Sequence, residues 1–354
     1  MESAELDRQT DRTVYFDYLR VFATFAVIIL HISAQNWYIA DVNGFEWQTF
    51  NFFDGIVRWS VPVFVMISGA LFLNRDLPLK KIYSKYISRM VISFVVWSVI
   101  YSLFESGTAM QRISSAIEGH YHMWFILMIT GIYMCIPFIK AVIHNDFNGK
   151  YYLVLAFIFA FIIPEALTLA DDFGSRLIIK GADAISNGIN NMDIHIVIGY
   201  ASYFILGYYL NKITFNRKQR IIIYAMGLFG FTATVVLNSS VALKTQEYCS
   251  HYYEYFTVNV LFEAAAVFTW FKYRKFDNEK LNFFMKKMSK YSFGAYLVHA
   301  LIIEQLDKQL GLNTLSFNPV LAVFFITVTV FAVSFGISAV LSRISIFLTR
   351  IRRA

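Results

Sequence analysis

The sequence predicts an all-α, polytopic membrane protein with about ten transmembrane helices and both termini in the cytoplasm. Of its 354 residues, 57% are hydrophobic and only 16% are charged, whereas a soluble domain is about a quarter charged. The apolar residues fall in repeated runs long enough to cross ~30 Å of hydrocarbon as helices. We therefore expect one membrane domain over residues 1–354, in which residues 1–13 are a polar cytoplasmic tail and no soluble catalytic domain is present.

The predicted spans alternate with basic and less basic segments. They cover residues 14–34, 54–73, 87–104, 122–140, 151–169, 194–210, 221–238, 255–271, 291–307 and 319–348. With a cytoplasmic N-terminus, the inner segments hold 24 of the 31 Lys and Arg residues and the outer loops hold five. Cytoplasmic loops of membrane proteins carry such an excess of Lys and Arg. The net charge of +7 is therefore explained by membrane topology and does not indicate a nucleic-acid partner. We expect a multi-pass protein of the inner or plasma membrane, surrounded by lipid.

The first span carries Asp17, Arg20 and His31 in an otherwise apolar run. Ionisable groups at membrane depth cost roughly 3 kcal/mol or more each, so they usually have a function. Eleven residues separate Arg20 from His31, which returns within ~20° of the same helix face and ~16.5 Å farther along the axis. Asp17 lies one turn before Arg20 and can pair with it. A single such residue is as often a snorkelling or packing residue, but two on one stripe favour a functional groove.

Packing features mark two other spans. In the second span, Pro62 predicts a kink, and Gly69 after Ser68 predicts a close helix contact. In the fourth span, Pro137 should end or bend the helix. The two cysteines, Cys135 in a span and Cys249 in an outer loop, are not expected to form a disulfide.

A basic stripe precedes the third span. Lys81, Lys85 and Arg89 recur every four residues, which places them on one helix face. At the membrane surface, such a stripe binds either lipid headgroups or a soluble polyanion. The sequence leaves both readings open.

Histidines mark the outer side of two further spans. His120, His122 and Trp124 cluster where the fourth span enters the bilayer, on the same side as His31, and this favours a shared site. In the ninth span, His299 is expected near mid-membrane and Glu304 farther out, ~140° round the helix, so the two need not share a partner.

The longest outer loop is expected at residues 170–193 and is rich in Asp and Asn. Side chains such as Asn191 and Asp193 bind sugar hydroxyls well, although they also occur in any turn. We therefore consider Asn191, Asp193, Trp124 and His299 as substrate-binding candidates. No CxxC or HxxxH spacing is present, and no metal is expected.

The first-helix segment DYLRVFATFAVIILH resembles the acyltransferase 3 family of integral membrane O-acyltransferases, whose mark is Arg or Lys, ten residues and then His. Similar segments follow in the family's order: PVFVMISGALFL, HMWFILMITGIYMCIPF, YFILGYYL and SFGAYLVH. In size the chain is most similar to stand-alone surface-glycan O-acetyltransferases, such as the enterobacterial common antigen type. One departure is that Tyr86 replaces the first of two arginines three apart at the third helix, where Arg89 is the second. We expect Lys85 to supply the missing charge.

The resemblance implies acetyl-CoA as donor and a hydroxyl of a glycan or lipid-linked sugar as acceptor. Arg20, Lys85 and Arg89 would hold CoA phosphate near the cytoplasm through charge-assisted bonds, with Asp17 in support. His31 would be the general base, since its ordinary pKa near 6.5 suits neutral pH. His122 and Trp124 would lie beside it and either shape the acceptor site or stabilise the oxyanion. A covalent acetyl-histidine relay stays open.

Two other classes of function compete with this one. A permease or flippase for a glycan or its intermediate would also need many spans and a polar intramembrane stripe, but half-chain symmetry is not evident. A haem protein would need paired axial histidines at similar depth, whereas His299 is expected deeper than His31 and His122. The acceptor, the exact acyl group and the oligomeric state are left undetermined by the sequence.

Overall fold

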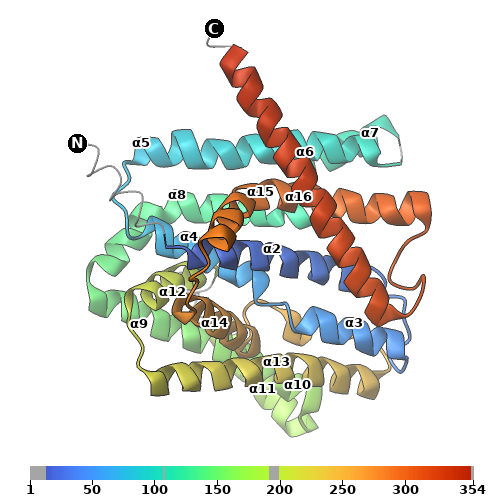
Figure 1. Ribbon diagram of the computed structural model, residues 1–354. Helices are drawn as coiled ribbons and strands as arrows, with labels where there is room; N and C mark the ends of the chain where they lie inside the picture. The colour runs from blue at the N-terminus through green and yellow to red at the C-terminus, as the bar shows by residue number, and fades with distance from the viewer. Residues whose placement is uncertain (1–12, 107, 191–198, 352–354) are drawn as a thin grey trace.

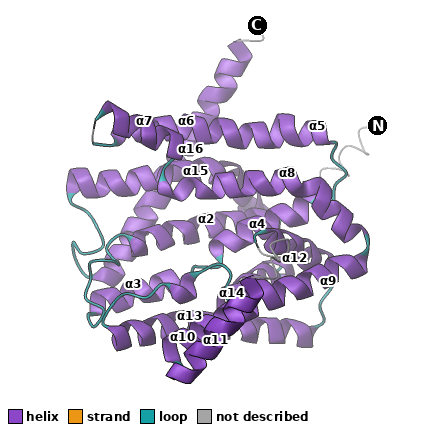
Figure 2. Ribbon diagram, turned by 180° about the vertical axis from the view of Figure 1, so that it is seen from behind, coloured by secondary structure: helices purple, strands orange, loops and turns teal. Residues whose placement is uncertain are grey.

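Helices form nearly all of the chain (Figures 1 and 2). The computed structural model describes residues 13–106, 108–190 and 199–351, and these contain no strand. The all-α prediction is therefore confirmed for this part of the chain.

Helices lie in the described part of every range predicted as a span. They are α2 (Tyr15–Ala34), α3 (Phe45–Gly55), α4 (Ser60–Phe72), α5 (Leu79–Lys81), η1 (Ile82–Ile87), α6 (Ser88–Phe104), α7 (Ala109–Glu118), η2 (Tyr121–Met123), α8 (Trp124–His144), α9 (Asp146–Ala156), η3 (Phe157–Ile162), α10 (Ile163–Phe173), α11 (Arg176–Asn190), α12 (Ala201–Lys212), α13 (Arg217–Thr245), η5 (His251–Tyr253), α14 (Val258–Tyr273), α15 (Glu279–Leu310) and α16 (Pro319–Ile351).

Seven helical segments in the described residues are long and apolar enough to cross a membrane. The prediction of about ten spans is thus supported for seven. Of the rest, α12 has 12 residues and α14 has 16, both short of the ~20 that span a bilayer, and the 32-residue α15 has lysines along its first half.

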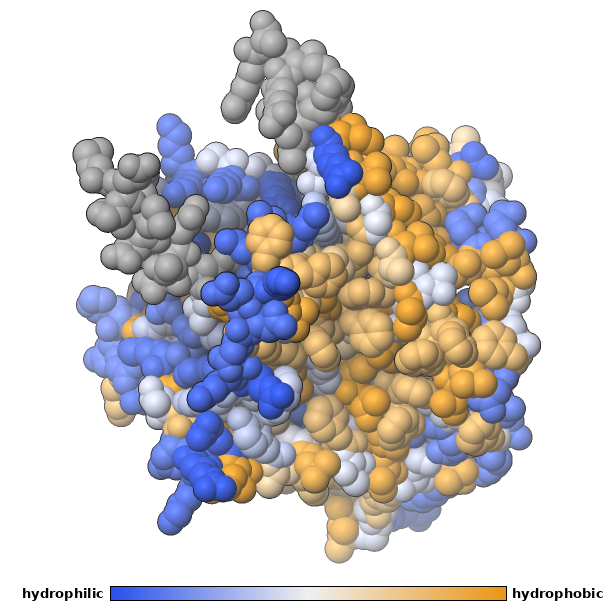
Figure 3. All heavy atoms as spheres, viewed as in Figure 1, coloured by the Kyte–Doolittle hydropathy of each residue, from blue (hydrophilic) through white to orange (hydrophobic). Residues whose placement is uncertain are grey.

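The surface supports a membrane location (Figure 3). Apolar side chains form a broad band across the face in view, with hydrophilic residues on either side of it. Helices α6 and α8 run across the same view in Figure 1, so the hydrophilic zones lie toward their ends. Many exposed large side chains are apolar, including Phe138, Leu228 and Phe324, which a membrane would cover.

Predicted inner and outer loops lie at opposite ends of the bundle. At one end, which we call the Arg20 end, Lys140 pairs with Asp76 at 2.6 Å and Lys272 donates to the carbonyl of Ile213. At the opposite end, which we call the His31 end, Asn43 donates to Gln246 at 2.8 Å. Each of these contacts joins two segments that the sequence predicts on the same side of the membrane.

Helix α2 is central, because it contacts α3, α4, α14, α15 and α16. Beside it, α4 and α12 pack backbone against backbone. A Cβ atom at Gly69 would lie 1.8 Å from the carbonyl oxygen of Phe204, and one at Gly207 would lie 2.1 Å from that of Met66. The predicted close contact at Gly69 is confirmed.

Three local predictions need correction. The break in the second span falls between α3 and α4, and Pro62 lies in the first turn of α4, where its missing N–H removes no helix bond. Of the two effects predicted for Pro137, ending the helix is excluded, because α8 continues to His144. The expected loop at residues 170–193 contains helix α11, because Leu177, Ile185 and their neighbours recur with helical period.

Candidate active site

Arg20 lies on α2 as the sequence predicts, paired with an acidic neighbour. Its Nη1 is 3.6 Å from Oδ1 of Asp17, whose side chain is 3% exposed. The same Nη1 donates to Oγ of Ser289 on α15 at 3.4 Å. The guanidinium is therefore fixed between two helices and not snorkelling to the lipid surface.

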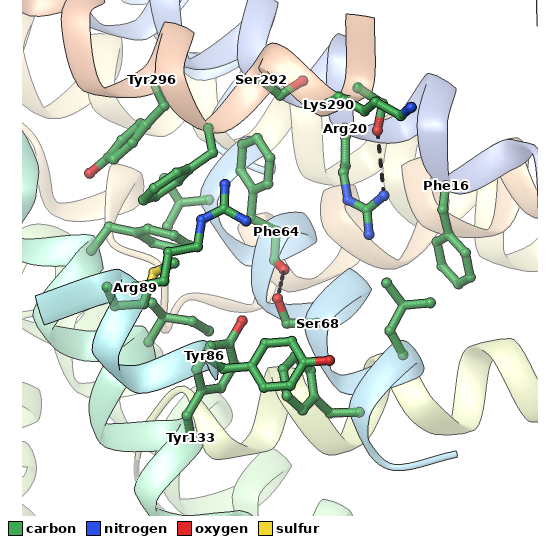
Figure 4. Close-up of a pocket in the computed structure, with 18 of the residues that line it drawn as sticks. Phe16, Arg20, Phe64, Ser68, Tyr86, Arg89, Tyr133, Lys290, Ser292 and Tyr296 are labelled. Atoms are coloured by element: carbon green, nitrogen blue, oxygen red, sulfur yellow. Dashed lines mark hydrogen bonds between the residues drawn. The ribbon is translucent and has the colours of Figure 1, made fainter. Parts of the chain in front are cut away.

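A cavity of about 830 Å³ opens beside Arg20 (Figure 4). Its wall includes four cationic side chains, Arg20, Arg75, Arg89 and Lys290, and no acidic one among the described residues. Figure 4 shows Arg20 and Arg89 extending into the same space from different helices. Such a wall suits a polyanionic ligand such as a phosphate group.

Lys85 does not line this cavity, unlike Arg89. Its side chain is exposed, and its Nζ lies 5.8 Å from the centre of the Tyr86 ring. The physical reason is η1, the π-helical turn over Ile82–Ile87. A π-helix bonds i to i+5, so residues spaced by four no longer share one face. Lys290 and Arg75 supply charge that the sequence had assigned to Lys85.

The cavity reaches within one helical turn of His31 without including it. Its inner wall contains Val27, four residues before His31, together with Phe125 and Tyr296. One turn of α-helix is ~5.4 Å. The Tyr296 hydroxyl donates to the backbone carbonyl of His122 at 2.5 Å, so this ring stands between the cavity and the histidines.

Three imidazoles from separate segments gather beyond that wall. The ring centroids of His31 and His299 are 5.0 Å apart, those of His122 and His299 are 5.1 Å apart, and those of His31 and His122 are 6.4 Å apart. We call these three residues the histidine cluster. His122 and His299 are almost fully buried, with 1% and 0% exposed. The predicted depth difference for His299 is wrong: α15 brings it to the level of His31.

Hydrogen bonds connect the histidine cluster to Glu304. Nε2 of His120 lies 2.7 Å from Oε1 of Glu304, and Nδ1 of His120 lies 2.8 Å from Nδ1 of His122. Lys308 also donates to Glu304, which favours the carboxylate, and a carboxylate only accepts. His120 Nε2 therefore carries a hydrogen toward Glu304, and the two Nδ1 atoms of His120 and His122 share a second hydrogen.

A ring nitrogen of His299 faces the cluster as a base. His299 Nδ1 donates to the carbonyl oxygen of Tyr296 at 2.5 Å, because a carbonyl only accepts. In neutral His299 the unprotonated nitrogen is therefore Nε2. The Nε2 atoms of His122 and His299 are buried, and neither has a side-chain hydrogen-bond partner among the described residues. The cluster thus places the lone pair of His299 beside His31.

Aromatic rings surround Trp124, one of the predicted substrate-binding residues. Trp124 is 38% exposed, and its ring is 5.7 Å from that of Tyr200 and 5.8 Å from that of Tyr255. The other two acceptor candidates, Asn191 and Asp193, lie outside the described residues.

Sequence reasoning missed a buried ion pair in the second span. Arg58 Nη2 lies 2.5 Å from Oδ2 of Asp54, and the guanidinium carbon lies 4.1 Å from the centre of the Tyr253 ring. An acid and a base four residues apart within an apolar run are the signal that would have found it. The contact between His120 and Glu304 was also missed, because it joins the segment between α7 and η2 to the distant helix α15.

Metal and haem binding can be compared with this geometry. Among the described residues, Asp172, Cys249 and His251 form a group whose metal-binding atoms lie within 4.8 Å of one another. The histidine cluster does not meet this distance criterion. Because His299 lies at the level of His31, a difference in depth does not exclude haem ligation. However, two histidines that bind haem hold the porphyrin between their rings, and in this cluster the third imidazole lies beside each pair of rings.

Comparison with known proteins gives a family and distant relatives. A family model described as an acyltransferase domain matches residues 13–339. Relatives called probable poly-beta-1,6-N-acetyl-D-glucosamine export protein, from Staphylococcus aureus strains MRSA252 and MSSA476, are each 21% identical over 348 residues, with 93% of both chains covered. No solved structure matches the chain.

Proposed function

Because the chain belongs to the acyltransferase domain family and is a membrane acyltransferase, we propose that it moves an acetyl group from cytoplasmic acetyl-CoA to a hydroxyl of a surface glycan or lipid-linked sugar. The observation that carries this proposal is the cavity. Its cationic wall begins at Arg20, and its inner end at Val27 lies one helical turn from His31.

The donor would enter from the Arg20 end. Arg20 and Arg89, with Arg75 and Lys290, would hold the CoA phosphates by charge-assisted hydrogen bonds. The pantetheine arm would run along α2 past Val27, and rotation of Tyr296 would admit the thioester to the histidine cluster. Asp17 would keep Arg20 oriented toward the cavity.

Acyl transfer would follow by general base catalysis. His31 takes the proton of the acceptor hydroxyl while the hydroxyl oxygen attacks the thioester carbonyl carbon. A C–O ester bond forms, the C–S bond breaks, and water at the Arg20 end protonates the CoA thiolate. The proton taken by His31 would leave through His122 and His120 to Glu304, which two hydrogen bonds connect in that order. This path requires His122 Nδ1 to donate to His120 Nδ1.

The acceptor would bind at the His31 end. Sugar rings pack on aromatic faces, and Trp124 offers one that is partly exposed beside Tyr200 and Tyr255. His299, within the cluster, would contact the same hydroxyl. Asn191 and Asp193 stay candidates for further sugar contacts.

Transport of a glycan is the second candidate function, because the Staphylococcus aureus relatives carry the name of a probable export protein. A transporter would move the glycan without consuming acetyl-CoA. The cationic cavity favours transfer, since a neutral glycan gives four basic side chains nothing to neutralise.

The decisive experiment uses the purified chain in lipid nanodiscs with acetyl-CoA labelled in the acetyl group, and mass spectrometry of surface glycans from cells with and without the protein. We expect saturable binding of acetyl-CoA and an added acetyl unit on a glycan only in cells that contain the protein. Glycan that changes in location but not in mass, together with no acetyl-CoA binding, would establish export instead.

A further inference from the structure

Three side chains with metal-binding atoms meet at the His31 end, away from the histidine cluster. Asp172 belongs to α10, whereas Cys249 and His251 lie in the segment between α13 and α14. One ligand atom of each lies within 4.8 Å of the others. Two segments more than seventy residues apart in the chain thus supply a carboxylate, a thiol and an imidazole to one point.

We propose that Asp172, Cys249 and His251 form a zinc site. A thiolate with an imidazole and a carboxylate is a donor set typical of Zn²⁺, whereas Ca²⁺ and Mg²⁺ prefer oxygen alone. The proposal does not depend on the acyl-transfer reaction, because none of the three residues lines the cavity or contacts the histidine cluster.

The observed distances are close to those of a tetrahedral centre. Zinc holds its ligands at ~2.0–2.3 Å, so neighbouring ligand atoms stand about 3.3–3.8 Å apart. Nδ1 of His251 lies 3.1 Å from Oδ2 and 3.2 Å from Oδ1 of Asp172. The His251 side chain is 54% exposed and can adjust, so small movements would seat the ion.

Neighbouring groups orient the carboxylate as the outer partners of metal sites do. The hydroxyl of Tyr252 donates to Oδ2 of Asp172 at 2.9 Å, and Lys244 donates to the Asp172 backbone carbonyl at 2.6 Å. These bonds leave Oδ1 for the ion. With three protein ligands, the fourth position would hold water.

The buried sulfur distinguishes this cluster from an ordinary surface ion pair. Asp172 and His251 alone would make such a pair, which needs no cysteine beside it. Cys249 is 3% exposed and is not in a disulfide, and the other cysteine, Cys135, lies in α8. A bound ion would fasten the end of α10 to the α13–α14 segment.

Cobalt substitution tests the site directly. The full-length chain in detergent, freed of metal with a chelator, would be titrated with Co²⁺. A thiolate bound to Co²⁺ gives a charge-transfer band in the near ultraviolet, so we expect this band at one ion per chain and its displacement by Zn²⁺. Cys249→Ser should abolish the band, and the matched variant Cys135→Ser should keep it.

His251→Asn provides a second variant if Cys249→Ser does not fold, because the His251 side chain is half exposed. It should weaken Co²⁺ binding by at least about tenfold while thermal unfolding in chelator stays as in the original chain. No thiolate band in the original chain, or a band that survives Cys249→Ser and disappears in Cys135→Ser, would overturn the proposal.

Discussion

Individual residues carry the chemistry of this protein through their protonation states. His299 donates its Nδ1–H to the carbonyl of Tyr296, which makes its Nε2 a buried base, and His122 shares a hydrogen with His120. His31 lies beside both, at the end of a helix whose first turns hold Arg20. In the proposed reaction His31 joins the donor side to the acceptor side, and two predictions concern His31 and the hydrogen bonds next to it.

Replacing the proposed base should stop transfer. We expect His31→Ala to lower acetyl transfer by about 10²- to 10⁴-fold, the usual contribution of a general base. Acetyl-CoA binding should persist, because Arg20 and Arg89 are untouched. His144→Ala, at the exposed end of α8, is the matched control and should keep full transfer, measured with acetyl-labelled donor. Normal transfer by His31→Ala would remove His31 from the mechanism.

The proton path predicts particular tautomers. The chain has only seven histidines, so the ring-nitrogen signals can be resolved by ¹⁵N NMR of protein labelled with ¹⁵N-histidine. We expect the Nδ1–H form for His122 and His299 and the Nε2–H form for His120. In His120→Phe, His122 loses its acceptor and should shift toward Nε2–H, whereas His144→Asn should leave it unchanged. An Nε2–H signal from His122 in the original chain would contradict the proposed direction.

Helices position these residues by close backbone contact and by one irregular turn. The π-helical turn η1 separates Lys85 from Arg89, so that only Arg89 enters the cavity. On the opposite wall, α4 presents Phe64 and Ser68 because its other face lies directly against α12 at Gly69. The shape of the cavity thus depends on contacts that carry no chemistry themselves.

Adding a methyl group at that contact should destabilise the protein. In Gly69→Ala the new methyl would meet the Phe204 carbonyl, and overpacking of this kind costs about 1–3 kcal/mol. Gly131→Ala, inside α8 with no described atom within 4 Å of the new Cβ, should be neutral or stabilising by up to about 1 kcal/mol. The thermal stability of both variants can be measured as the fraction of protein that stays monodisperse in size-exclusion chromatography after heating to a series of temperatures. Equal stability of the two variants would contradict the packing described.

The whole molecule separates a polar passage from the surrounding lipid. Basic loops gather at the Arg20 end, the histidines and the Asp172, Cys249 and His251 group lie toward the opposite end, and apolar side chains form the band between them (Figure 3). The cavity crosses part of that band and stops at Val27, Phe125 and Tyr296. In the proposed reaction these three side chains would therefore control the access of the thioester to His31.

Blocking the inner end should separate binding from transfer. Val27 is 3% exposed and lines the cavity, so Val27→Trp should fill the route to His31. We expect acetyl-CoA to bind as before, since the four cationic side chains stay in place. Acetyl transfer should fall by at least about 10²-fold, because the thioester could no longer reach His31. Phe22→Trp, on the same helix but 50% exposed, should retain both. Undiminished transfer by Val27→Trp would place the thioester elsewhere.

The sequence by itself determined the helical class, the membrane character, the alternating ends and the stripe from Arg20 to His31, because these follow from local composition and helical period. It could not determine that His299 joins His31 and His122, that Glu304 contacts His120, or that Lys85 leaves the cavity. Those facts depend on how α15 lies against α2 and on the π-helical turn η1. The depth of a side chain in the membrane and the direction in which it points depend on packing between segments that are distant in the sequence. A local sequence pattern therefore cannot predict them.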